Sequence, residues 1–218
     1  MRPNTAHTLH DFYEALYGAL GPSRWWPGET PLEVIVGAVL TQNTAWNNVE
    51  KAISALKAAE VLEGRALLEL PEEALAELIR PAGFFRLKAG RLRNVLKFFD
   101  EICDFDFGRL ADMDTERLRE RLLQVRGVGQ ETADSILLYA LERLSFVVDA
   151  YTWRLLNRHG LAGDEAEYGE IREMFMAALP EDVPLYNEYH ALIVRAGKAW
   201  CRKNRPLCAE CPLGKFLE

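Results

Sequence analysis

The chain has 218 residues, of which 49% are hydrophobic, so it can bury a core in one domain or in two small ones. It lacks both the apolar run of about eighteen residues that a membrane span needs and the apolar stretch of a signal peptide, so we expect a cytoplasmic protein. The formal net charge of −7 disfavours general attraction to nucleic acid, but phosphates bind local patches and not averages.

Apolar residues at helical spacing, separated by short Gly, Pro and Asp breaks, predict an all-α protein. The run Phe146-Val147-Val148 is the one β-like segment, and it is too short to support a sheet. The predicted helices cover residues 7–20, 31–41, 45–60, 71–79, 85–102, 114–124, 131–143, 150–159, 166–178 and 185–200.

Charge is segregated along the chain. Acidic residues gather in 60–77 and 164–182, and basic residues recur in 195–205. Such a distribution suits a surface that faces DNA and an acidic, solvated back. The segment 80–97 is basic without an acidic residue, through Arg80, Arg86, Lys88, Arg91, Arg93 and Lys97.

Two segments near the N-terminus carry side chains that could act in a site. Thr41-Gln42-Asn43-Thr44 follows an apolar run, and by itself it is typical of a helix terminus. Trp25-Trp26-Pro27 lies in a loop where paired tryptophans are hard to explain as core. Trp46, in contrast, continues with Val49, Ile53 and Leu56 as a helical core stripe, so a packing role stays open for it.

The stretch around Gly127-Val128-Gly129 predicts a helix-hairpin-helix. Glycine permits the sharp turn and the close approach of a phosphate, and the helix that follows offers its N-terminus to an anion. Asp149 lies twenty residues beyond Gly129, directly after an apolar run. It could merely cap the helix that begins near Tyr151, and capping is compatible with catalysis.

Taken together, these motifs resemble the helix-hairpin-helix DNA glycosylases of the endonuclease III superfamily, and most of all the 3-methyladenine DNA glycosylase III branch. The resemblance runs from residue 25 to about 155 and continues more weakly to the cysteine loop. It implies two helical lobes with a central cleft for DNA and the flipped base. One lobe would span 28–141 with the hairpin near 125–130, and the other would join 1–27 to 142–218 and end in the loop 201–211.

The resemblance also implies roles for single residues. Asp149 would be the catalytic carboxylate that stabilises an oxocarbenium-like sugar. The superfamily's Leu-[Ser/Thr]-x-Gln motif supplies a glutamine that fills the gap left by a flipped nucleotide, and Gln42 is assigned to it. Hairpin residues would bind the DNA backbone, namely Arg126, Gly127, Val128, Gly129 and Gln130.

A departure from the superfamily concerns Glu131. Members that also nick the DNA place a lysine there, whose amine forms a Schiff base with the sugar. A glutamate cannot form that adduct, so we expect a monofunctional glycosylase that leaves an abasic site. As a residue of a helix's first turn, Glu131 also fits a plain surface role.

An aromatic pocket is implied for the damaged base. Its residues would be Trp25, Trp26, Pro27 and Trp46, with Glu131 nearby. A base such as N3-methyladenine is cationic, so indole faces would attract it and its glycosidic bond needs no general acid.

Three cysteines form a Cys-x6-Cys-x2-Cys pattern at 201, 208 and 211. The superfamily's 4Fe-4S loop is similar but has a fourth cysteine where this chain has Leu217. Three alternatives stay open: a bound 4Fe-4S cluster, a vestigial loop that folds without metal, and a zinc site completed by His190.

The expected activity is therefore base excision from double-stranded DNA by a monomeric enzyme, with an alkylated purine as substrate. One rival is an endonuclease III-type glycosylase and lyase for oxidised pyrimidines that uses another lysine. A second rival is a helix-hairpin-helix protein that binds DNA without catalysis.

Overall fold

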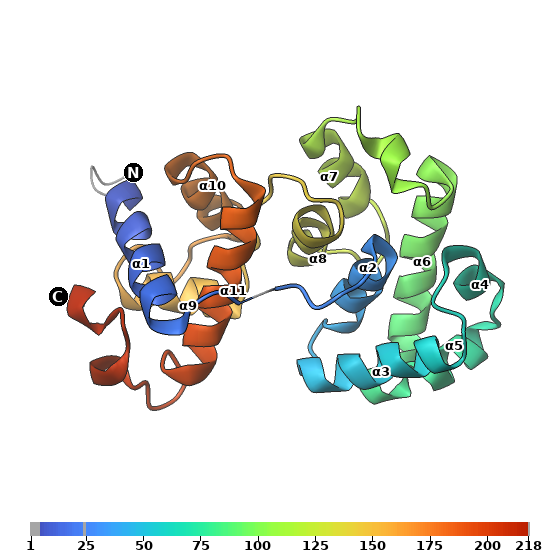
Figure 1. Cartoon of the computed structure of the whole chain (residues 1–218), viewed down its shortest axis with the longest axis horizontal. Helices are drawn as coiled ribbons and strands as arrows, with labels where there is room; N and C mark the ends of the chain where they lie inside the picture. The colour runs from blue at the N-terminus through green and yellow to red at the C-terminus, as the bar shows by residue number, and fades with distance from the viewer. Residues whose placement is uncertain (1–4, 24, 218) are drawn as a thin grey trace. The chain divides into compact units, whose positions relative to one another are not determined.

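The computed structural model describes residues 5–23 and 25–217, and over these ranges the chain forms helices and loops but no β-strand (Figure 1). The predicted all-α class is confirmed. The α-helices are α1 (Thr5–Leu20), α2 (Pro31–Leu40), α3 (Trp46–Ala58), α4 (Gly64–Glu69), α5 (Glu72–Leu78), α6 (Phe85–Cys103), α7 (Thr115–Leu123), α8 (Gln130–Ser135), α9 (Ala150–Arg158), α10 (Tyr168–Ala178) and α11 (Val183–Ala199).

Short turns complete the secondary structure. Four are 3-10 turns: η1 (Arg80–Ala82), η2 (Phe107–Leu110), η4 (Cys208–Glu210) and η5 (Gly214–Phe216). The helix predicted over 131–143 is in fact α8 followed by a π turn, η3 (Ile136–Ala140). Helix α4 was not predicted; it begins where the Glu63 carboxylate accepts hydrogen bonds from the first helical N–H groups. No helix of the described ranges is both long and apolar enough to cross a membrane.

The chain forms two compact units. Unit 2 consists of Pro27–Arg143, and unit 1 combines the chain up to Trp26 with the chain from Leu144 onward. Within unit 2, α2 is buried on all sides from Leu32 to Leu40, because its sequence is apolar except for Glu33, whose carboxylate pairs with Lys57 at 2.9 Å. It packs against α3, α6, α8 and η3 and so forms the centre of this unit.

Unit 1 is built around aromatic rings. Phe146 stacks on Phe175 at 3.9 Å between ring centroids, and Tyr189 packs edge-on against both. The Tyr189 hydroxyl donates to Leu9 O at 2.7 Å, which ties α11 to α1. The segment that was β-like in sequence, 146–148, is a buried loop that contributes to this core.

Candidate functional site

The loop between α7 and α8 turns at Gly127. This residue has a φ of +98°, and a Cβ atom there would collide with the Arg91 side chain. Val128 buries its side chain and donates its N–H to Val125 O at 3.0 Å, so its amide is used inside the turn. The N–H groups of Gly127 and Gly129 have no acceptor within the described ranges, which leaves them available to an anion.

A buried ion pair holds the two hairpin helices together. Arg119 of α7 donates from Nε and Nη2 to the two carboxylate oxygens of Asp134 in α8, at 2.7 and 3.0 Å. Asp134 is fully buried and the Arg119 side chain is only 13% exposed. Such a bidentate pair fixes the angle at which the hairpin is presented.

The Gln42 side chain is committed to the hairpin. Its Nε2 donates to Gly127 O (3.1 Å) and to Thr132 Oγ1 (3.0 Å), and its Oε1 accepts from Arg91 Nη1 at 2.5 Å. Asn43, the next residue, is exposed and has a φ of +51°. Counted from Leu40-Thr41, Gln42 stands at the third place of the Leu-[Ser/Thr]-x-Gln pattern and Asn43 at the fourth.

A buried lysine connects the loop after α2 to the turn before α6. Lys88 is 1% exposed, and its Nζ donates to Leu40 O (2.8 Å), Thr44 Oγ1 (2.6 Å) and Ala82 O (2.7 Å). Burial and the charge of Arg91 lower the pKa of its ammonium to about 8. The turn that it holds presents Phe84, which is 70% exposed with a φ of +45°.

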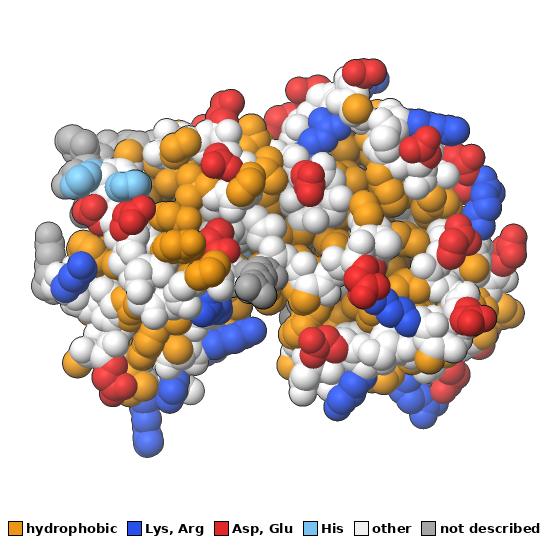
Figure 2. Space-filling model, viewed as in Figure 1, with side chains coloured by type: hydrophobic (Ala, Val, Ile, Leu, Met, Phe, Trp, Pro, Cys, Tyr) orange, Lys and Arg blue, Asp and Glu red, His pale blue; other side chains and the backbone are white. Residues whose placement is uncertain are grey.

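Some of the cations in the basic segment 80–97 are hydrogen-bonded within the protein, so fewer of them can bind phosphate than the composition suggested. Lys88 cannot meet solvent or phosphate, and the Arg93 guanidinium donates to Leu70 O at 2.6 Å. Arg86 and Lys97 remain exposed. In the 195–205 segment, Arg195 binds the carbonyls of Leu20 and Gly21. Figure 2 accordingly shows acidic and basic side chains interspersed over the face that it draws.

A groove of about 340 Å³ continues from the hairpin between α6 and α7. Its cations are Lys97, Arg121 and Arg126, and its one carboxylate is Glu101. Asn94 supports its wall by donating to Arg126 O at 3.0 Å. This basic groove lies next to the free hairpin amides, as expected of a surface that follows a phosphate backbone.

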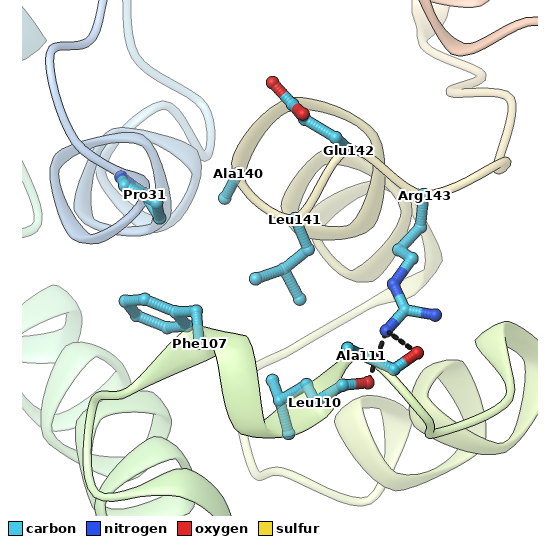
Figure 3. Close-up of a pocket in the computed structure, with 8 residues that line it drawn as sticks. All are labelled: Pro31, Phe107, Leu110, Ala111, Ala140, Leu141, Glu142 and Arg143. Atoms are coloured by element: carbon cyan, nitrogen blue, oxygen red, sulfur yellow. Dashed lines mark hydrogen bonds between the residues drawn. The ribbon is translucent and has the colours of Figure 1, made fainter.

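Unit 2 also has an open hollow of about 490 Å³ that contains none of the predicted site residues (Figure 3). The Arg143 guanidinium at its edge donates to the carbonyls of Leu110 and Ala111, which ties η2 to the end of η3 (Figure 3). The charge of Arg143 at this hollow therefore serves to join two backbone segments.

In unit 1, Asp149 is the N-cap of α9. Its Oδ1 accepts from Tyr151 N (2.9 Å), Thr152 N (2.8 Å) and Thr152 Oγ1 (3.0 Å). Its Oδ2 lies 3.7 Å from His190 Nε2 of α11. Burial alone would raise the pKa of Asp149, but the interactions with His190 and Thr152 outweigh it and lower the pKa. The carboxylate is therefore ionised at neutral pH although it is only 13% exposed.

The aromatic pocket residues belong to different units. Trp25 and Trp26 are in unit 1, with ring centroids 5.2 Å apart at 66°. The segment before them is anchored to α11, because Ser23 donates to the Glu188 carboxylate from its N–H (2.8 Å) and its hydroxyl (2.7 Å). Pro27 and Trp46 belong to unit 2, as does Glu131, which is exposed in the first turn of α8.

The cysteine loop does not fit a four-iron cluster as it is folded. Cys201, Cys208 and Cys211 line one small cavity of about 10 Å³, about the space of one water molecule, and Leu217 lines it too. Arg158 Nη1 donates to Cys201 Sγ at 2.9 Å, and no set of three or more side chains in the described ranges has the arrangement of a metal site. His190, which the zinc alternative would need as its fourth ligand, lies beside Asp149.

Sequence reasoning missed Phe84 as a site residue, and it named Lys88 only as one of the basic residues of 80–97 and His190 only as a zinc alternative. The order Gly83-Phe84 was a usable local signal, because a glycine turn can expose the side chain that follows it. Nothing local marked Lys88 or His190, whose contacts are with residues 48 and 41 positions away.

Comparison with known proteins places this arrangement in a family. The family described as "HhH-GPD superfamily base excision DNA repair protein" matches residues 36–181. A Methanocaldococcus jannaschii protein named as a DNA repair glycosylase is 50% identical over 99% of this chain and 98% of its own length. Endonuclease III of Thermotoga maritima is 31% identical over 86% of this chain and 83% of its own length.

Solved structures have the same fold. The Helicobacter pylori 3-methyladenine DNA glycosylase bound to 1,N6-ethenoadenine superposes with a TM-score of 0.76 at 30% identity, covering 88% of this chain and 97% of that one. An endonuclease III–DNA complex superposes with a TM-score of 0.80 at 19% identity, covering 98% of this chain and 95% of that one.

Proposed function

The chain belongs to the HhH-GPD superfamily of base excision DNA repair proteins and is a DNA glycosylase, and we propose that it is a monofunctional one that removes alkylated purines such as 3-methyladenine from double-stranded DNA. The observation that carries the proposed chemistry is the setting of Asp149: its side chain is only 13% exposed, its Oδ1 accepts three hydrogen bonds, and, against the effect of burial, His190 and Thr152 lower the pKa of its carboxyl group.

In the proposed reaction, the bond between C1′ and the base nitrogen breaks, and the base leaves with the electron pair. For an N3-methylated adenine the leaving base is neutral, because the substrate base was a cation. The Asp149 carboxylate stabilises the positive charge that develops on the sugar. Water then adds at C1′, its proton passes to the carboxylate or to solvent, and an abasic site remains.

Two features support the absence of a lyase step. Glu131 stands where the bifunctional pattern has its nucleophilic lysine, and a carboxylate cannot form a Schiff base. Lys88 has the lowered pKa that a nucleophilic amine needs, but its Nζ is buried and engages three oxygen acceptors. It is a structural residue and no replacement for the missing lysine.

The preference for alkylated purines rests on likeness and on chemistry. The paired indoles of Trp25 and Trp26 supply aromatic faces that attract a cationic base by about 0.5–2 kcal/mol per contact. The Helicobacter pylori glycosylase with 30% identity was solved with a modified purine, 1,N6-ethenoadenine.

We assign insertion into the duplex to Phe84 and Asn43. Both are exposed at positive φ, on the two segments that Lys88 ties together. Apolar wedges that unstack a base step are a common means of extruding a nucleotide. Gln42 then acts by joining this tip to the hairpin, since its amide is already bonded to Gly127 and Thr132.

The wedge assignment predicts that Phe84→Ala weakens binding to a duplex with an abasic-site analogue about tenfold, the scale of one lost base–aromatic stacking contact. Fluorescence anisotropy measures the Kd. Tyr17→Ala, which removes an exposed aromatic of α1, is the matched control and should keep the wild-type Kd. Equal Kd values for Phe84→Ala and wild type would exclude Phe84 from the DNA contact.

The activity itself is tested by incubating the protein with methylated DNA and separating the released bases by chromatography. The same reactions are run on a denaturing gel with and without hot alkali. Release of 3-methyladenine with strand breaks only after alkali is the expected result. If no alkylated base were released and a parallel reaction on oxidised DNA released pyrimidines, the proposed substrate would be overturned. Breaks before alkali would overturn the monofunctional mechanism, and tight binding without release of any base from either DNA would show a non-catalytic protein.

A further inference from the structure

The two oxygens of Asp149 have different surroundings. All three donors that come from α9 itself, Tyr151 N, Thr152 N and Thr152 Oγ1, bind Oδ1. These bonds do what an N-cap requires and leave Oδ2 uninvolved. The group that faces Oδ2 is the His190 imidazole, 3.7 Å away at ion-pair distance.

His190 is held in place by the packing of α11. The residue is 5% exposed, and its neighbours on the helix are buried as well. Its ring lies edge-on to Phe146, at 6.4 Å and 87°. Helices α9 and α11 pack so closely that a Cβ at Gly197 would collide with the Tyr151 ring. The imidazole therefore cannot move away from the carboxylate without disturbing the core.

Three other polar side chains, one each from α9, α11 and α10, have partners elsewhere. Arg154 of α9 donates to Cys201 O at 2.7 Å, and Tyr189 of α11 donates to Leu9 O at 2.7 Å. The Tyr168 hydroxyl of α10 accepts from Val148 N at 3.3 Å. Among the described residues of α11, His190 is the one with an ion-pair contact to the Asp149 carboxylate.

We infer that His190 is a positioning residue for the glycosylase reaction: its imidazole faces Oδ2 of Asp149 at 3.7 Å and keeps the carboxylate oriented and anionic as it meets the developing sugar cation. This inference rests on the proposed function. Its physical reason is that burial drives a carboxyl group towards its neutral form, and a neutral carboxyl cannot stabilise an oxocarbenium-like state.

The test compares wild type with His190→Phe, which keeps a ring of similar size but no nitrogen, and with His190→Gln, which restores a donor. Single-turnover base release is measured against pH, and the Kd for DNA is measured separately. For His190→Phe we expect the acidic limb of the rate profile to move up by about one pH unit or more, with unchanged Kd. His190→Gln should recover most of the rate. Superimposable profiles, or a loss of rate that is equal at every pH, would overturn the inference.

A second measurement is independent of activity. The Asp149 carboxyl resonance, identified by its absence in Asp149→Asn, is titrated by carbon NMR in the wild type and in His190→Gln and His190→Phe. The pKa of Asp149 should rise when His190 is replaced by Phe, and an unchanged pKa would overturn the inference. If the wild type released no base at all, the proposed function would fail while this titration still decided the role of His190.

Discussion

Asp149→Asn is expected to lower single-turnover base release by about 10²–10³-fold, because the charge that stabilises the sugar cation is lost. The fold should survive, since asparagine is as good an N-cap as aspartate and its amide oxygen can accept the bonds from Tyr151 N and Thr152 N. Chromatographic base release on alkylated DNA measures the effect.

Two controls separate chemistry from folding and binding for this variant. Its Kd for DNA should match that of the wild type, and its melting temperature should fall only by the small amount that losing the Asp149–His190 ion pair costs. A variant with these properties that nevertheless kept the wild-type rate would exclude Asp149 as the catalytic residue.

Asp134→Ala is expected to lower the free energy of unfolding by about 3–5 kcal/mol, the scale of breaking a buried ion pair by removing one partner. The substitution leaves the Arg119 guanidinium, 13% exposed, without the carboxylate that takes two of its hydrogen bonds. Equilibrium unfolding in urea measures the change, and DNA affinity should fall with it because α7 and α8 present the hairpin.

The matched comparison is Glu77→Ala, which breaks the exposed Arg80–Glu77 pair. That variant should keep almost all of its stability, because exposed pairs contribute little. The double variant Arg119→Leu/Asp134→Leu should be more stable than Asp134→Ala, since it leaves no buried charge unpartnered. If Asp134→Ala were as stable as Glu77→Ala, the buried pair would have no role in holding the hairpin.

Much of the secondary structure could be predicted because its signals are local. Apolar periodicity and Gly or Pro breaks predicted most of the helices, and Gly127 does have the positive φ expected of the hairpin. The prediction was wrong where a local rule was too coarse: the helix expected to reach 143 gives way to a π turn after Ser135, and Glu142 has a φ of +50°.

The candidate site was harder to predict because its contacts span long distances in the sequence. A lysine in a basic segment predicts an exposed cation, and only the fold reveals that Lys88 is buried among three oxygen acceptors. Likewise, no periodicity predicts that Gln42 bonds to a residue 85 positions away, or that Asn43 beside it is exposed. Side-chain direction at a helix end depends on backbone angles that composition does not encode.

The division of the chain between its two units sets an order for folding during synthesis. All of unit 2 leaves the ribosome before most of unit 1, so its contiguous residues can fold first. Helix α1 is made earliest, yet its partners α10 and α11 are made among the last, and the Tyr189–Leu9 bond spans 180 residues. The nascent chain must therefore carry an unpartnered amphipathic α1 through most of translation, and unit 1 closes only when the C-terminal helices have emerged.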